Sequence, residues 1–262
     1  MNELYKRTLY TIKAKWLIHE IFEYDISKAN ISILLQYGYI SPAEYNMYAQ
    51  MDRMQRQIAI GRLQKNPEYK NAIANGFENA RKELIVQNSI NEEDIVSIKK
   101  DAMYVLKRLH VTDFGHVHFT LRGTYTIFIY CMGLEIYYFY NELTDDYDIQ
   151  VKGISDELLP LHEAFISVIC EALRMVQKGD IKSAIEYIAM IRTKYFNREL
   201  PIEYYREFNR TSVYKISGCN YGVMGLSEEE IKHQIVGIID IMYNNTFLME
   251  FHRILMEIMF TR

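Results

Sequence analysis

The N-terminal part of the chain alternates between two hydrophobic periods. Residues 17–25 carry a short apolar run that ends at an acid, Asp25, and they predict a strand. Residues 29–37 repeat apolar positions at helical spacing and predict a short helix. The intervening Ser-Lys-Ala-Asn is typical of a turn. The chain therefore passes from a strand to a helix directly after a carboxylate.

Two interpretations of Asp25 are open at this point. An acid between a strand and a helix is a natural turn or N-cap residue. A carboxylate at the end of a core strand is also suited to hold a metal ion. The stretch by itself favours the turn or N-cap interpretation.

The next segments predict helices and a β-hairpin. Residues 41–65 have a helix start signal at Ser41-Pro42 and are long enough to break once into a helical hairpin. Residues 69–87 predict a further helix that ends near Asn88. Two β-rich runs, 95–98 and 102–106, then flank Lys99-Lys100-Asp101 and predict a hairpin with an acid at its tip.

The remainder divides into a strand-rich part and a helical part. A meander of four strands is expected over 116–152, from the segments 116–123, 124–133, 135–142 and 147–153. Amphipathic helices are expected over 156–179 and 180–196, an irregular stretch over 209–226, and a long helix over 227–258. The predicted class is α+β, with an antiparallel sheet and packed helices in residues 1–152 and a helical region in 153–262.

Composition narrows the function classes. The net charge of −4 provides no global basic field, so any binding of nucleic acid needs a local groove. The three cysteines are scattered without a CxxC pair, which favours a reducing compartment. Signal-peptide and membrane-spanning patterns are absent, as are the P-loop, GxGxxG, HExxH and GxSxG motifs. A cytoplasmic protein without a membrane partner is expected.

The order of the charged residues suggests a chemistry. A strand ending in Asp25 is followed by a helix with Arg56 and then by a hairpin with Asp101 at its tip. Two-metal nucleotidyl transfer needs two carboxylates on neighbouring strands, which hold cations about 3.5–4 Å apart. A basic residue on an intervening helix would neutralise an incoming triphosphate.

These motifs resemble the palm and thumb of family B DNA polymerases in reduced form. "YDISKANISIL" is similar to their first palm motif, a strand ending in Asp followed by a Ser-Leu-Tyr-Pro-Ser turn, and "SIKKDAMYV" is similar to their Tyr-Gly-Asp-Thr-Asp-Ser hairpin. "RQIAIGRLQK" matches the fingers helix loosely, because it lacks the Asn and the Tyr-Gly. "LRGTYT" resembles the Lys-Lys-x-Tyr element, and "VKGISDELLPLHEAF" and "GDIKSAIEYIAMI" resemble parts of the thumb.

The resemblance implies a palm-like domain over 1–152 with short helical fingers at about 41–65, and a thumb-like region over 153–262. It implies that two Mg²⁺ ions, or Mn²⁺, are held by Asp25 and Asp101. A nucleoside triphosphate would be bound by Ser27, Ala29, Asn30, Arg56, Arg62 and Lys65. Primer-template DNA or RNA would be contacted by Lys100, Arg122, Tyr125 and Lys152.

Two departures from the family affect the expected activity. Ala29 occupies the position of the sugar-discriminating Tyr, so the preference between dNTPs and NTPs is open. Lys99 replaces the first acid of the hairpin. A chain this compact would suit a virus or a mobile element, with a polymerase or replication subunit as a partner and the host cytoplasm as its location.

Two other functions remain open. The acidic net charge and the missing hairpin acid favour a non-catalytic nucleic-acid-binding or assembly protein derived from a polymerase palm. The other is an α+β structural protein in which the Tyr-rich meander binds a partner, although tyrosine is also a common strand residue.

Overall fold

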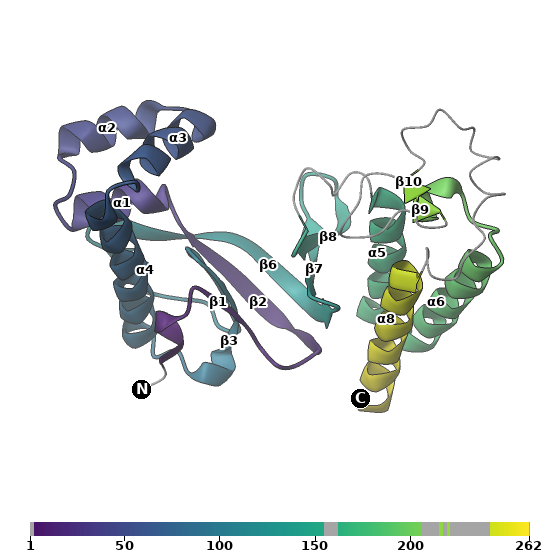
Figure 1. Ribbon diagram of the computed structural model, residues 1–262. Coiled ribbons are helices and arrows are strands. Elements are labelled where there is room, and N and C mark those ends of the chain that lie inside the picture. Colours follow the sequence, from purple (N-terminus) through teal and green to yellow (C-terminus); the bar gives the residue numbers. More distant parts are fainter. Residues whose placement is uncertain (1–2, 155–161, 206–214, 217–218, 221–241, 262) are drawn as a thin grey trace. The chain divides into compact units, whose positions relative to one another are not determined.

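The computed structural model describes residues 3–154, 162–205, 215–216, 219–220 and 242–261 (Figure 1). The chain forms two compact units. The first contains residues 1–13 and 20–124, and the second contains residues 14–19 and 125–262. The division runs through strands β2 (Trp16–Ile26) and β6 (Val117–Cys131), so each of these strands contributes to both units. The domain boundary expected from the sequence after residue 152 coincides with the end of strand β8 (Asp146–Lys152).

The first unit is built on an antiparallel sheet with the strand order β1-β3-β4-β2-β6, and the short β5 pairs with β6. The hairpin predicted around Lys100 is confirmed as β3 and β4. Strand β4 also pairs with β2, in a register that places Asp25 opposite Ala102. The strands of this unit are β1 (Leu9–Thr11), β2 (Trp16–Ile26), β3 (Ile95–Lys99), β4 (Ala102–Val105), β5 (Asp113–Phe114) and the first part of β6 (Val117–Cys131).

Side chains that cap the helix N-termini determine where helices of the first unit begin. Ser41 forms a capping box with Glu44, and Asp52 accepts a hydrogen bond from the Gln55 amide at 2.8 Å. The second cap begins a new helix after Met51, which confirms that the predicted helical segment is broken once. The helices are α1 (Ala29–Gln36), α2 (Pro42–Gln50), α3 (Arg53–Leu63) and α4 (Pro67–Gln87), and the short 3₁₀ turns are η1 (Glu3–Lys6) and η2 (Glu92–Asp94).

The core of this unit lies between the sheet and helices α1 and α4. This core contains the alternate β2 residues Phe22, Tyr24 and Ile26, together with Ile33 of α1 and Leu84 of α4. Because successive side chains of a strand point to opposite faces, Asp25 is directed away from this core. The packing that fixes β2 therefore leaves its acid available for another contact.

Gly76 allows α1 and α4 to approach each other. A Cβ atom at this position would overlap the Ile33 side chain and would lie 3.2 Å from Tyr37. Ile33 is fully buried and β-branched, so it has little freedom to move aside. We expect Gly76→Ala to lower the free energy of unfolding by about 1–3 kcal/mol in urea denaturation, although Ala is the better helix former.

Gly61→Ala is the matched control, because a Cβ there meets no described atom within 4 Å. This variant should gain up to about 1 kcal/mol from helix propensity alone. Equal stabilities of the two variants would contradict the close approach of the two helices.

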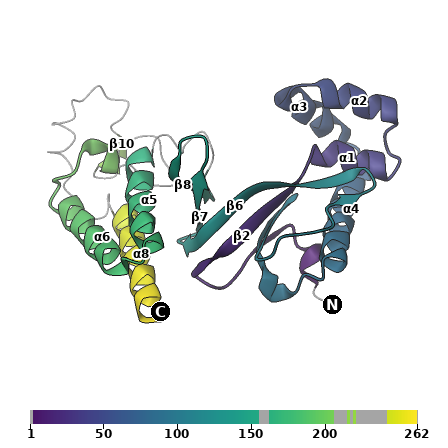
Figure 2. The same cartoon turned by 180° about the vertical axis from the view of Figure 1, so that it is seen from behind.

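The second unit combines the rest of β6, β7 and β8 with three helices. Figure 2 shows α5, α6 and α8 side by side, and Phe165, Leu173 and Phe251 pack with Ile136 and Tyr138 in their shared core. The elements are β7 (Leu134–Asn141), β8 (Asp146–Lys152), α5 (Glu163–Gln177), α6 (Ile181–Phe196), η4 (Ile202–Tyr205), β9 (Lys215–Ile216), β10 (Cys219–Asn220) and α8 (Met242–Thr261). Strands β6, β7 and β8 are neighbours and antiparallel.

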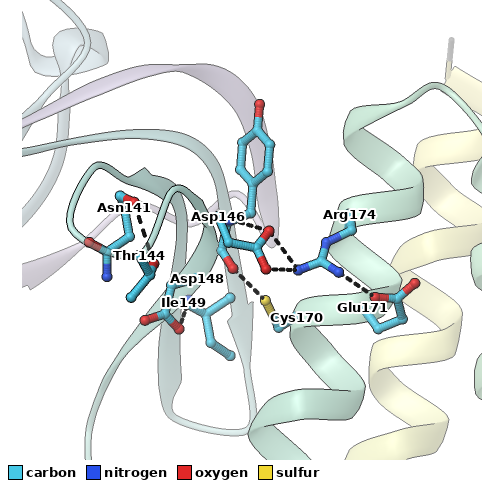
Figure 3. A network of polar contacts seen from close by, with 9 residues as sticks. Asn141, Thr144, Asp146, Asp148, Ile149, Cys170, Glu171 and Arg174 are labelled. Atoms are coloured by element: carbon cyan, nitrogen blue, oxygen red, sulfur yellow. Dashed lines mark hydrogen bonds and ion pairs between the residues drawn. The ribbon is translucent and has the colours of Figure 1, made fainter.

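A polar network ties the β7–β8 hairpin to α5 (Figure 3). Arg174 donates from Nη2 to both carboxylate oxygens of Asp146 at 3.0 Å and from Nη1 to Glu171 at 3.1 Å. The Cys170 thiol lies 3.5 Å from the Tyr147 carbonyl oxygen, and burial raises its pKa to about 11. This cysteine is therefore held as a neutral packing residue.

The α+β class is confirmed, and some element boundaries differ from the predictions. The two strands expected over 116–123 and 124–133 form the single strand β6. Gly123 has no positive φ angle there, so it continues the strand and makes no turn. Helix α4 begins at Pro67 because the Asn66 side chain caps it. The expected helical residues 156–161 and 227–241, and most of the irregular stretch 209–226, lie outside the described residues.

Candidate functional site

The end of β2 is fixed by backbone hydrogen bonds to the β3–β4 turn and to strand β6. The Ile26 amide donates to the Asp101 carbonyl at 3.3 Å, and the Ser27 amide donates to the His118 carbonyl at 3.0 Å. Lys28 then adopts a left-handed conformation with φ of 51° and turns the chain into α1. These bonds place Asp25 beside the hairpin tip that carries Asp101.

The hairpin tip is a tight turn held by the N-terminal segment. Lys100 has a positive φ of 55°, which such a turn requires. Its amide donates to the Thr8 carbonyl at 2.7 Å. The next residue, Asp101, is half-buried and lies one position before the Ala102 that pairs with Asp25. Asp101 thus lies in the hairpin turn, next to the strand position that pairs with Asp25.

A cavity of about 460 Å³ opens at this point of the first unit. It collects residues from the ends of β2 and the hairpin, from the start of α1, from one face of α3 and from β6. The lining residues are Asp25, Ile26, Lys28, Ala29, Asn30, Ile31, Arg53, Arg56, Gln57, Ile60, Asp101 and Arg122.

Four basic side chains and two acids face each other in this cavity. Lys28 is contributed by the β2–α1 turn, Arg53 and Arg56 by α3, and Arg122 by β6. The cavity therefore has a local excess of positive charge, although the net charge of the whole chain is −4. A cleft with one prevailing sign of charge concentrates ligands of the opposite sign, so anionic ligands are favoured here.

Two of the arginines are partly oriented by the protein. Nη1 of Arg56 donates to the Met51 carbonyl at 3.0 Å, which holds the half-buried guanidinium near the start of α3. Nε of Arg122 lies 3.8 Å from Oδ2 of Asp25. The other carboxylate oxygen, Asp25 Oδ1, is buried and has no hydrogen-bond partner among the described residues.

The environment raises the pKa of both acids. Burial, followed by the charge of Asp101, raises the pKa of Asp25 from 3.8 to about 6, against the opposing effect of Arg122. Burial also raises the pKa of Asp101, and Lys100 and Arg81 oppose this. Burial thus outweighs the neighbouring positive charges at both acids, and the charge of Asp101 further disfavours ionisation of Asp25.

This pKa of Asp25 predicts a pH dependence of stability. A carboxyl group that binds protons more tightly when folded stabilises the protein below its unfolded pKa, and this contribution is lost as the pH rises to about 6. The stability of Asp25→Asn relative to the wild type should therefore increase as the pH is raised from 4 to 6.5. We expect about 1–2 kcal/mol after allowance for solvent, measured by urea unfolding at each pH. A difference that does not change with pH would contradict the raised pKa.

The structure brings together half of the sequence-predicted residues. Asp25, Asp101, Ala29, Asn30, Arg56 and Arg122 all line the cavity. The other residues predicted to bind nucleotide or nucleic acid within this unit, which are Ser27, Arg62, Lys65 and Lys100, are absent from the described lining.

Several of these residues have other roles or surroundings. The Ser27 hydroxyl shares a 2.7 Å hydrogen bond with Thr120 and helps to anchor the end of β2 to β6. Arg62 and Lys65 are exposed at the other end of α3. Tyr125, in the second unit, is buried against Tyr137 and Phe139 and donates to Gln150.

Three polar lining residues were not among the predicted site residues. Arg53 and Gln57 lie on the same helical face as Arg56, so the helical period alone would have found them. Lys28 could not be found in this way. The position of its side chain depends on a left-handed backbone conformation, which the local sequence does not predict.

No group of three or more His, Cys, Asp or Glu side chains in the described ranges is arranged to hold a metal ion. Two carboxylates are nevertheless a sufficient protein contribution for Mg²⁺, which usually completes its coordination with water and substrate phosphates. The unpartnered Asp25 Oδ1 and the raised pKa of both acids fit a cation at this place.

The fold and the cavity define an α+β protein in which two acids and four basic side chains meet at the end of a central strand. A family model described as "Bacteriophage PBS1 gene 130 protein" matches residues 1–257, and the chain belongs to this family. No curated protein matches the chain. None of the described helices has the length and apolar character needed to cross a membrane.

Proposed function

We propose that this protein is a polymerase-like nucleotidyltransferase that acts on a primer-template nucleic acid with the help of divalent cations. The observation that carries the proposal is one cavity in which Asp25 and Asp101 meet basic side chains from the β2–α1 turn, from α3 and from β6. The acids suit cations, and the basic residues suit phosphates.

Asp25 and Asp101 would hold two Mg²⁺ ions, or Mn²⁺ in their place. Bound there, such ions activate a 3′-hydroxyl group and neutralise a leaving pyrophosphate. The carboxylates contribute the negative charge that keeps the cations in position. The charge of a bound cation would also offset the burial of both acids and the repulsion that Asp101 exerts on Asp25.

The triphosphate of a nucleotide would be held by α1 and α3. The backbone N–H groups at the start of an eight-residue helix, α1, border the cavity at Ala29 and Asn30. Free N–H groups and the positive end of the helix dipole favour phosphate there. Arg53 and Arg56 add charge-assisted donors from the facing helix.

The arrangement of the first unit supports a palm-like interpretation. A strand that ends in an acid, a helical hairpin with arginines and a β-hairpin with a second acid follow one another along the chain. Ala29 borders the cavity with a methyl group only, so a ribose 2′-hydroxyl meets no large side chain at this position. We therefore expect the enzyme to accept NTPs as well as dNTPs.

Contact with the nucleic-acid backbone would come from Arg122 and from Lys100, which is exposed at the hairpin tip. Tyr125 is buried, and Lys152 lies opposite Glu135 in the second unit. We base the proposed contact on Lys100 and Arg122 for this reason.

Primer extension with labelled dNTPs and NTPs tests the proposal, with Mg²⁺ or Mn²⁺ supplied and with both withheld. The expected result is extension that depends on the cation. The absence of both extension and any cation-dependent thermal shift would overturn it. Salt-sensitive binding of primer-template DNA without extension would point to a non-catalytic nucleic-acid-binding protein.

A further inference from the structure

Arg81 of α4 is a charged side chain in the interior of the first unit. Only 1% of its surface is exposed. Its Nε donates to the Tyr5 carbonyl at 2.8 Å, and its Nη1 donates to the Lys100 carbonyl at 2.7 Å. One guanidinium thus bridges the N-terminal segment and the turn that carries Asp101.

Burying a guanidinium is unfavourable unless its donors are satisfied. Within the described residues, Arg81 forms no ion pair with a carboxylate, and its hydrogen bonds go to the two carbonyl groups. A helix face directed at a core would ordinarily carry an apolar residue. We therefore expect the Arg81 guanidinium to have a role that an apolar side chain could not perform.

The position of Lys100 suggests this role. The turn is fixed by three bonds: the Lys100 amide to Thr8, the Lys100 carbonyl to Arg81, and the Asp101 carbonyl to the Ile26 amide. The last of these bonds joins the turn to the strand of Asp25. Rotation of the peptide group between Lys100 and Asp101 would move the Asp101 side chain, and the Arg81 bond opposes this rotation.

We propose that Arg81 is a positioning residue, which holds the Lys100 carbonyl so that the Asp101 carboxylate stays beside Asp25. The inference rests on the proposed function for its effect on cation binding and catalysis. The restraint on the hairpin tip is a property of the fold, and it can be tested separately.

The test compares Arg81→Met, which removes both hydrogen bonds, with Arg81→Lys, which keeps a cation with fewer donors. Leu84→Ala is the control, because this fully buried residue lies one turn further along α4 and contacts the core. Mn²⁺ affinity is measured by electron paramagnetic resonance. Arg81→Met should weaken it by about 10–100-fold, as removal of an outer-shell partner does, and Arg81→Lys should weaken it less. Leu84→Ala should leave it unchanged although it destabilises the fold.

Amide hydrogen exchange provides the measurement that does not need a metal. In Arg81→Met the Lys100 and Ile26 amides should lose protection, while the Tyr104 amide in the same hairpin keeps it. Wild-type Mn²⁺ affinity together with unchanged protection of Lys100 would overturn the inference. If the wild type binds no Mn²⁺, the proposed function fails, and the exchange pattern still decides the role of Arg81. If Arg81→Met does not fold, Arg81→Lys provides the same comparison.

Discussion

Asp25→Asn is expected to remove Mn²⁺ binding and to lower the rate of the proposed primer extension by at least about 10²–10³-fold, because several kcal/mol of cation stabilisation would be lost with the carboxylate. Asp101→Asn should have the same effect. Each variant leaves a single acid in the described lining of the cavity, and one carboxylate cannot hold a pair of cations. The double variant should therefore be little worse than either single variant.

Asp113→Asn is the control for this result. Asp113 is an exposed acid of the same unit, paired with His118 outside the described cavity lining, so its loss changes the net charge equally. It should keep Mn²⁺ binding and extension. Asp25→Asn is also expected to be more stable than the wild type at pH 7, so unfolding does not explain its loss of activity. A Mn²⁺-dependent thermal shift that persists in both acid variants would contradict the site.

The parts of the site that local sequence patterns determine could be predicted. The apolar run before Asp25 and the β-rich runs around Lys100 indicate a strand and a hairpin, and both are present. Ser41-Pro42 begins a helix at the expected place because its cap needs only neighbouring residues. These patterns place both acids at element ends. They do not specify which strands pair, and the β2–β4 register, which brings the acids together, depends on the whole sheet.

The remaining features depend on contacts between distant residues. Lys28 has a left-handed conformation in the turn between β2 and α1, and Lys100 has one in the turn between β3 and β4. Non-glycine residues give no sequence signal for this conformation. Arg81 is typical of an exposed helical position by composition. It is buried because two carbonyl groups, 76 and 19 residues away in sequence, accept its hydrogen bonds. The continuity of β6 through Gly123 likewise follows from its pairing with neighbouring strands.

The arginines of α3 should govern nucleotide affinity, with Arg56 contributing more than Arg53. Arg56 is already oriented by its bond to the Met51 carbonyl, so it loses less side-chain freedom when a phosphate binds. A hydrogen bond to a charged group contributes about 1.5–3 kcal/mol, so Arg56→Gln should raise the Kd for a nucleoside triphosphate by about 10–100-fold. Arg53 is exposed and lacks such a tether in the described contacts, and Arg53→Gln should raise it by less than about 10-fold.

Arg62→Gln separates this interpretation from a general loss of positive charge. Arg62 lies on the same helix and is exposed, but it is not part of the described lining of the cavity. The Arg62→Gln variant should bind nucleotide with the Kd of the wild type, as measured by fluorescence titration. The difference between Arg53→Gln and the wild type should shrink as salt is raised, because exposed charges are screened, whereas the half-buried Arg56 should keep most of its effect. Equal effects of the Arg56 and Arg62 variants would show that the cavity face of α3 does not bind the phosphates.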